Sequence, residues 1–215
     1  MRVTVVGTIH EPVGPATADA LLAILRQLQP EVVFLEMPPG AFNEYMGGSR
    51  TNLEADAVRK YRAERDIELV AVDLPTPEPE FFSGWDDVRR EVRSKSVDYC
   101  RFKSYEEQYV SQYGFNYLNS EHNSKLTADL HVATVEALAA LGDERLSAHY
   151  DAFTRKIDDR DVAMIANIEE FCRTSTKTLG VLLVGSAHRR SLFDKTRART
   201  SAESSSVVWD FLGSV

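Results

Sequence analysis

Short apolar runs alternate along the chain with segments that have the periodicity of helices. Four runs have the length and the β-branched content of buried strands, and they span residues 3–6, 32–36, 68–73 and 180–185. Between the first two runs, leucines recur at helical spacing from Leu21 to Leu28, and the pattern stops at Pro30. This order predicts a βαβ unit with two parallel strands and a right-handed crossover.

The same alternation continues in the rest of the chain, with one long interruption. Residues 52–65 and 158–173 have the apolar spacing of helices, and the proline-rich residues 73–80 predict a loop. Residues 86–150 lack strand signals and predict a helical insertion or lid, with a polar loop at 114–125 as its most mobile part. We therefore expect one domain of the α/β class, with a mainly parallel central sheet flanked by helices.

Composition and charge narrow the classes of function. The 215-residue chain has 43% hydrophobic and 27% charged residues, as ordinary globular domains do, and a net charge of -8. This charge opposes the approach of polyphosphate, so we expect no nucleic-acid partner. The basic stripe at 89–95 is typical of a solvated helix face rather than a docking patch.

Targeting and redox features are those of a cytoplasmic protein. The chain begins with a strand pattern, MRVTVVG, without a secretory signal, and it lacks an apolar run of the roughly 20 residues that span a membrane. Cys100 and Cys172 lie far apart and predict neither a disulfide framework nor a thiolate metal site. We expect a cytoplasmic location and no membrane partner.

Polar residues stand just past all four predicted strands, and they are His10, Glu36, Asp73 and His188. Two of these ends share a pattern, because VVGTIH and LVGSAH each place a glycine three residues before a histidine. Gly7 and Gly185 have no Cβ, which favours a sharp turn or the close approach of another group. Since the carboxyl ends of parallel strands meet at one edge of the sheet, we expect both imidazoles to lie over that edge.

Three of these side chains predict a metal site. Two imidazoles and one carboxylate, from His10, His188 and Glu36, can hold a divalent ion and leave positions open for water or substrate. Such an ion lowers the pKa of bound water towards about 7 and polarises a carbonyl group, which is hydrolytic chemistry. The three side chains should then approach one common point.

Each of these residues also has a structural interpretation. A histidine after a strand is often only hydrogen-bonded, Glu36 could cap a helix or pair with an arginine, and Asp73 suits a turn equally well. Arg160 either pairs with a neighbouring aspartate or points to the strand ends, where it could clamp a substrate carboxylate or an oxyanion. The remaining histidines lack ligand spacing and are expected to be structural or exposed: His122, His131 and His149.

Several segments together resemble the TraB/PrgY/Tiki superfamily, which includes GumN-like proteins and, more distantly, erythromycin esterases and ChaN-like haem-binding proteins. The segments are GTIH at 7–10, FLEMP at 34–38, AVDLP at 71–75, DDRDVAMIANI at 158–168 and VLLVGSAH at 181–188. The resemblance covers residues 1–75 and 155–192, about half of the chain. The middle of the chain does not visibly match.

The resemblance implies a site made of two G-x-x-H motifs, a glutamate and an arginine, which fall here on Gly7 with His10, Glu36, Arg160, and Gly185 with His188. It also implies metal-dependent peptidase activity with manganese or cobalt. This chain departs from the pattern at Asp159, where the family often has glutamate. Tiki-type members are extracellular and membrane-tethered, so their substrates do not carry over to this chain.

Taken together, the residues and the resemblance predict a metal-dependent hydrolase of peptide or amide bonds, with a peptide or small-molecule substrate. His10, Glu36 and His188 would hold manganese or cobalt, with zinc and iron as further options, and Arg160 would stabilise developing negative charge. Two alternatives stay open. One is a metal-free, esterase-like hydrolase with His10 or His188 as general base. The other is a non-catalytic protein that binds haem or a small molecule in the same cleft.

Overall fold

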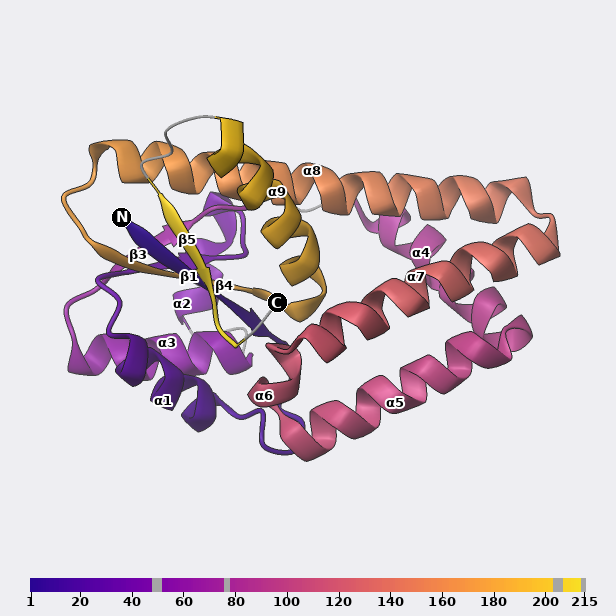
Figure 1. Cartoon of the computed structure of the whole chain (residues 1–215), viewed down its shortest axis with the longest axis horizontal. Helices are drawn as coiled ribbons and strands as arrows, with labels where there is room; N and C mark the ends of the chain where they lie inside the picture. The colour runs from indigo at the N-terminus through magenta and orange to yellow at the C-terminus, as the bar shows by residue number, and fades with distance from the viewer. Residues whose placement is uncertain (48–51, 76–77, 203–206, 214–215) are drawn as a thin grey trace.

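A parallel sheet lies between two layers of helices, in the left half of the molecule in Figure 1. The computed structural model describes residues 1–47, 52–75, 78–202 and 207–213. Its strands are β1 (Arg2–Thr8), β2 (Val32–Leu35), β3 (Glu68–Ala71), β4 (Leu179–Gly185) and β5 (Val208–Phe211). They pair in the order β3-β2-β4-β1-β5, and every pair is parallel. The predicted α/β class is confirmed, and β5 is a strand that the sequence pattern did not predict.

Helices cover both faces of this sheet. The α-helices are α1 (Ala18–Leu28), α2 (Phe42–Gly47), α3 (Leu53–Glu64), α4 (Pro79–Lys95), α5 (Val97–Tyr113), α6 (Phe115–Leu118), α7 (Glu121–Leu141), α8 (Glu144–Thr174) and α9 (Arg189–Ala202), and the 3-10 turns are η1 (Pro39–Ala41) and η2 (Ser186–His188). Side-chain oxygens of Thr17 and Asn52 accept backbone N–H bonds and cap the starts of α1 and α3. These two helices cover one face of the sheet, and α8 and α9 cover the other (Figure 1).

Alternation along the strands builds two cores, one on each face. In β2, Val33 and Leu35 pack towards α1 and α3, whereas Val32 and Phe34 pack towards α8. The central strands β1, β2 and β4 are therefore buried on both sides, which explains why they appear in the sequence as nearly continuous apolar runs.

A third core lies in a helical arm formed by α4, α5, α7 and the first half of α8, which extends away from the sheet (Figure 1). The expected insertion at 86–150 is helical, but its bounds differ. Helix α4 begins at Pro79, within the predicted loop 73–80, and residues 76–77 of that loop lie outside the described ranges. Helix α8 runs without a break from Glu144 to Thr174, so one helix belongs to both the arm and the sheet layer.

The prediction of a loop at 114–125 is wrong. These residues form α6 and the start of α7, and the side chains of Asn119 and Asn123 are buried and hydrogen-bonded. The Asn119 side chain accepts a bond from the Gly7 N–H (2.7 Å) and donates one to the Gly7 carbonyl (3.0 Å), which joins the arm to β1. A Cβ at Gly7 would lie 2.5 Å from the Arg189 side chain, so close packing inside a strand, not a turn, requires this glycine.

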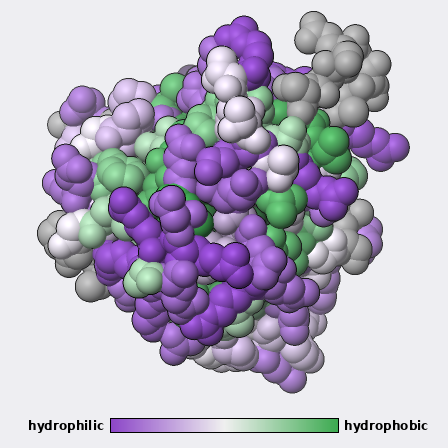
Figure 2. Space-filling view, turned by 90° about the vertical axis from the view of Figure 1, so that its left-hand side faces the viewer, coloured by the Kyte–Doolittle hydropathy of each residue, from purple (hydrophilic) through white to green (hydrophobic). Residues whose placement is uncertain are grey.

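The side of the molecule on the left in Figure 1 is mainly polar. Figure 2 shows this face, on which hydrophilic residues surround small apolar areas. Scattered apolar residues of this kind are normal on a protein surface. No helix in the described ranges combines the length and the apolar character needed to cross a membrane.

Candidate active site

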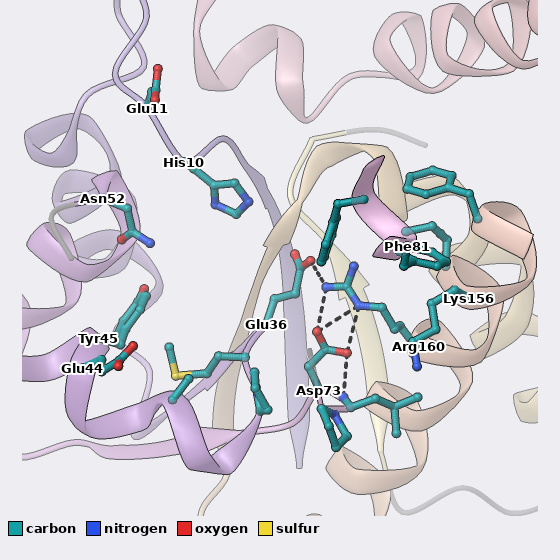
Figure 3. Close-up of a pocket in the computed structure, with 18 residues that line it drawn as sticks. His10, Glu11, Glu36, Glu44, Tyr45, Asn52, Asp73, Phe81, Lys156 and Arg160 are labelled. Atoms are coloured by element: carbon teal, nitrogen blue, oxygen red, sulfur yellow. Dashed lines mark hydrogen bonds and ion pairs between the residues drawn. The ribbon is translucent and has the colours of Figure 1, made fainter. Parts of the chain in front are cut away.

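A pocket of about 540 Å³ lies at the carboxyl edge of the sheet (Figure 3). Residues that follow β1, β2 and β3 form its floor, among them His10, Glu36 and Asp73. Helix α2 contributes one wall, and the start of α4 together with the middle of α8 contributes the other. This is the edge at which open α/β sheets bind ligands.

Glu36 is the central acid of the pocket floor, directly after β2. Its Oε1 accepts a hydrogen bond from Arg160 Nη2 at 2.5 Å, and its Oε2 accepts one from the Gly185 N–H at 2.6 Å. Burial alone would raise the pKa of Glu36, but the contacts with His188, Arg160 and Gly185 outweigh it and lower the pKa to about 2. The side chain is therefore a carboxylate at neutral pH and not a general acid.

Arg160 joins two strand ends. Its Nε and Nη2 donate to both carboxylate oxygens of Asp73 at 2.6–3.1 Å, and Nη2 also reaches Glu36. Of the two interpretations open for Arg160, the structure shows the one in which it points to the strand ends. It lies in the middle of α8, and not at a helix start as its sequence context suggested. Its Nη1 makes no hydrogen bond to the described residues, so the two N–H groups of this nitrogen remain for a ligand.

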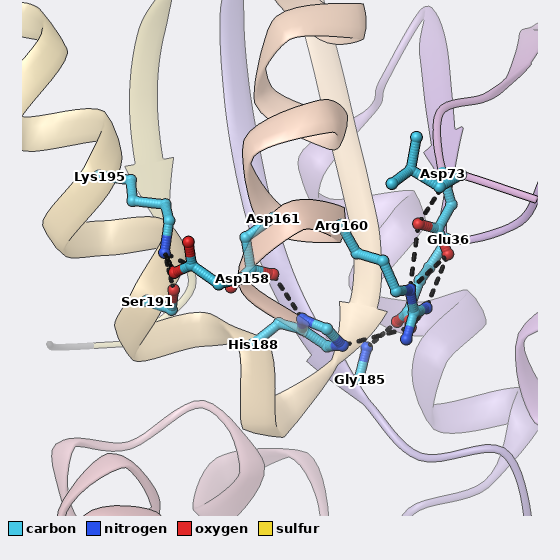
Figure 4. A network of polar contacts seen from close by, with 10 residues as sticks. Glu36, Asp73, Asp158, Arg160, Asp161, Gly185, His188, Ser191 and Lys195 are labelled. Atoms are coloured by element: carbon cyan, nitrogen blue, oxygen red, sulfur yellow. Dashed lines mark hydrogen bonds and ion pairs between the residues drawn. The ribbon is translucent and has the colours of Figure 1, made fainter. Parts of the chain in front are cut away.

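His188 lies in η2 behind Glu36, between two carboxylates (Figure 4). Its Nδ1 is 2.5 Å from Asp161 Oδ1, and its Nε2 is 3.4 Å from Glu36 Oε1. Burial would lower the pKa of His188, but Asp161 and Glu36 together raise it to about 9, so the imidazole is a cation at neutral pH. The side chain is 7% exposed, which corrects the expectation that both imidazoles lie over the sheet edge.

These contacts form a chain of side chains with alternating charge. Two members lie in α8, one lies in η2, and two follow β2 and β3. Its members, in order, are Asp161, His188, Glu36, Arg160 and Asp73. Lys195 lies 3.9 Å from the second oxygen of Asp161 at one end of the chain. Because each buried charge has an opposite neighbour, the chain can hold Glu36 and Arg160 in fixed orientations without leaving a charge unpaired.

His10 has a different environment from His188. Its side chain is 70% exposed towards the pocket, and its Nδ1 lies 3.3 Å from Glu54 Oε1. The same oxygen accepts a 2.7 Å hydrogen bond from the Thr8 hydroxyl, which fixes the acid in place. The hydrogen bond with Glu54 is the main reason that the pKa of His10 is raised, and burial opposes it.

A small cavity of about 30 Å³ lies next to His10 and is also lined by Glu36, Tyr45, Asn52 and Glu54. Glu54 Oε2 is buried and has no hydrogen-bond partner among the described residues. A polar cavity with an unsatisfied oxygen is the kind of place that holds an ordered water. The cavity therefore places a potential water site beside an imidazole and a carboxylate.

The predicted metal ligands fit a shared ion only in part. The 3.4 Å between His188 Nε2 and Glu36 Oε1 suits two ligands that each lie roughly 2 Å from one ion. His10 is paired with Glu54 instead, and both oxygens of Glu36 already accept hydrogen bonds. In the described part of the chain, no three His, Cys, Asp or Glu side chains are arranged to hold a metal ion. As arranged, these residues do not fit the three-ligand centre.

Two important acids were missed at the level of sequence. Glu54 follows the cap of α3 and Asp161 follows Arg160, and neither position carries a motif that marks its partner. The three other histidines do not line the pocket. His131 bonds to the Tyr150 hydroxyl, His122 packs against tyrosines, and the His149 ring lies close to Gly84.

Comparison with protein-family models gave no match, and comparisons with curated proteins and with solved structures gave none either. The likeness to the TraB/PrgY/Tiki superfamily is therefore still a prediction from the motifs.

Proposed function

We propose that the protein is a hydrolase of amide or ester bonds in which His10 is the general base. The observation that carries the proposal is the pairing of His10 with Glu54 at the edge of an open pocket that also contains Arg160. A carboxylate that holds one imidazole nitrogen and leaves the other free is the arrangement by which many hydrolases orient a base. His188 does not suit this role, because it is buried and both of its nitrogens face carboxylates.

In the proposed reaction, His10 Nε2 removes a proton from water as the water attacks the substrate carbonyl carbon. Glu54 stabilises the imidazolium that forms, and the same proton then passes to the leaving amine or alcohol as its bond to the carbonyl carbon breaks. The raised pKa of His10 suits this exchange, because a base works best when its pKa lies near the working pH.

Arg160 has the role of stabilising the oxyanion. Glu36 and Asp73 hold its Nε and Nη2, which leaves Nη1 for the oxygen that becomes negative in the transition state. Because the guanidinium is fixed before substrate binds, little reorganisation is needed during the reaction.

The metal-dependent peptidase predicted from the sequence is the second candidate. The 3.4 Å between His188 and Glu36 supports it, as does Asp161 behind His188, since metal-bound histidines commonly donate their other N–H to a carboxylate. Manganese or cobalt is the proposed ion for this candidate, with zinc or iron as options. Because the third ligand is not in place, we assign no reaction step to an ion.

The cell compartment and the class of substrate belong to the same proposal. Cys100 and Cys172 are both free thiols, which supports a reducing compartment, and we propose the cytoplasm. The net charge of -8 and the pocket volume of about 540 Å³ support a small molecule or a peptide as substrate, rather than nucleic acid.

The deciding experiment compares His10→Gln with His122→Gln, which replaces an exposed histidine outside the pocket. Protein purified without a metal-affinity tag is assayed on p-nitrophenyl acetate and on N-acyl amino acids, before and after treatment with a chelator. We expect His10→Gln to lose about 10²-fold or more of kcat/KM, while His122→Gln and chelated wild type keep full activity.

Other results would change the assignment. Activity that is lost on chelation and restored by manganese or cobalt would favour the metal-dependent candidate, and elemental analysis would identify the ion. Absence of turnover under every condition would overturn the hydrolase proposal. The non-catalytic alternative would then be tested by absorbance titration with haem.

A further inference from the structure

One face of α8 lines the pocket with three kinds of side chain in a fixed order. Phe153, Lys156 and Arg160 stand at positions i, i+3 and i+7, and all three line the cavity. Along the helix axis, Lys156 lies about 6 Å and Phe153 about 10 Å from Arg160. A substrate that lies along α8 therefore meets the reaction centre, then an ammonium group, then an aromatic ring.

The aromatic end of this face is part of a row of stacked rings from α4 and α8. The centroids of the Trp85 and Phe153 rings are 4.0 Å apart, and the two rings are 4° from parallel. The Tyr150 ring also stacks with Trp85, with centroids 5.9 Å apart. Phe81 lies 6.0 Å from Phe153, and Phe82 follows it at 5.6 Å. The row ends in the pocket with Phe82, which is 43% exposed and offers its ring for a further aromatic contact.

Lys156 is a cation that makes no ion pair on its own wall of the pocket, and the further acids Glu11 and Glu44 lie on the opposite wall (Figure 3). Glu36 and Asp73 already balance the charge of Arg160, whereas Lys156 has no carboxylate partner among the residues that the structure describes. Figure 3 shows Lys156 and Arg160 on the same wall of the pocket. An ammonium group placed in this way favours an anionic group on the ligand, next to the reacting bond.

We propose that the substrate is an N-acyl derivative of an aromatic amino acid, or a short peptide that ends in one, with a free carboxylate. The scissile carbonyl lies at Arg160, the carboxylate on Lys156, and the aromatic side chain against Phe82 and Phe153. Water adds to the acyl carbon, the C–N bond breaks, and the free amino acid leaves with a proton from His10. This inference rests on the proposed hydrolase, since it names the substrate of the same site.

Binding can be tested without turnover in the His10→Gln background. Isothermal titration calorimetry with N-acetylphenylalanine, N-acetylalanine and N-acetylphenylalanine amide separates the contributions of the ring and of the carboxylate. We expect N-acetylphenylalanine to bind most tightly, by about tenfold over the amide and about fivefold over the alanine compound.

Two variants assign these differences to residues. Lys156→Met should remove the preference for the free carboxylate without changing the affinity for the amide, and Phe82→Leu should remove the preference for the ring. Lys125→Met, which replaces an exposed lysine on α7, is the matched control and should change neither preference.

Equal affinity of all three compounds, or preferences that survive both variants, would overturn the proposed substrate class even if wild type hydrolyses other amides. Binding with the expected preferences in His10→Gln, together with no turnover in wild type, would support the ligand class and reject the hydrolase. The two proposals can therefore fail separately.

Discussion

The His188 imidazolium gives the free energy of unfolding a pH dependence that an Asp161→Asn variant should largely lose. Two carboxylates raise the pKa of His188 from 6.5 to about 9 in the folded protein. A group with a raised pKa in the folded state stabilises fully below its unfolded pKa, and this contribution is lost as the pH rises through the folded value. The window for His188 is therefore pH 6.5 to about 9.

The size of the effect follows from the same two pKa values. A change from 6.5 to about 9 corresponds to about 3 kcal/mol of folding free energy below pH 6.5. Glu36 is the partner of His188 in this interaction, and its pKa is lowered from 4.5 to about 2. At acid pH, the free energy of unfolding should therefore fall as the pH drops from 4.5 towards 2. The shifted pKa values of His188 and Glu36 partly reflect the same contact, so the two free energies are not added.

Urea denaturation of wild type and Asp161→Asn between pH 5.5 and 10 measures the difference. We expect the variant to be less stable by about 3 kcal/mol near pH 6, and the gap to narrow steadily as the pH rises from 6.5 to about 9. Asp98→Asn is the control, because Asp98 pairs with Arg101 on the surface, and it should cost less than about 1 kcal/mol without this pH dependence. A gap between wild type and Asp161→Asn that stays constant from pH 6 to 10 would refute the assignment of a buried imidazolium.

Three further predictions concern the pocket and the arm. Arg160→Ala should lower turnover by about 10²-fold and, in urea titrations, destabilise the fold by about 3 kcal/mol, because the buried carboxylates of Glu36 and Asp73 lose their cationic partner. Arg160→Lys should keep most of the stability. The acid limb of kcat/KM should lie above pH 6.5, because His10 must lose its proton to act, and in Glu54→Gln it should move to lower pH in a pH–rate profile. Hydrogen exchange should show residues 115–124 as protected as the sheet, and fast exchange there would contradict the buried bonds of Asn119.

The sheet could be predicted from the sequence because its central strands are buried on both faces. β2 and β4 appear as apolar runs, and the rule that parallel strands end at one edge placed Glu36 and His188 near each other. Edge strand β5 lacked this signal, since Val208 is exposed and Asp210 interrupts the run. A short strand with one open side carries too few apolar residues to be recognised by pattern alone.

The arm shows why polar composition misled the prediction of a loop. Residues 114–125 are rich in asparagine and serine, which are typical of loops, yet Asn119 and Asn123 are buried. The Asn123 side chain bonds to the nearby Leu118 carbonyl, whereas the Asn119 side chain bonds to backbone groups of Gly7, and those contacts exist only after the arm has packed on β1. Long-range hydrogen bonds of this kind leave no periodic pattern in the sequence.

The two G-x-x-H motifs acquire different roles because different acids meet them. The same local pattern places each histidine after a strand, but β1 continues to a position beside Glu54, whereas β4 continues into η2 against α8 and Asp161. One acid beside an exposed ring leaves a nitrogen free to move a proton, and two acids around a buried ring hold it as a fixed cation. The chemistry of each motif is thus decided by a partner far away in the sequence, which explains why the repeat alone indicated two equivalent metal ligands.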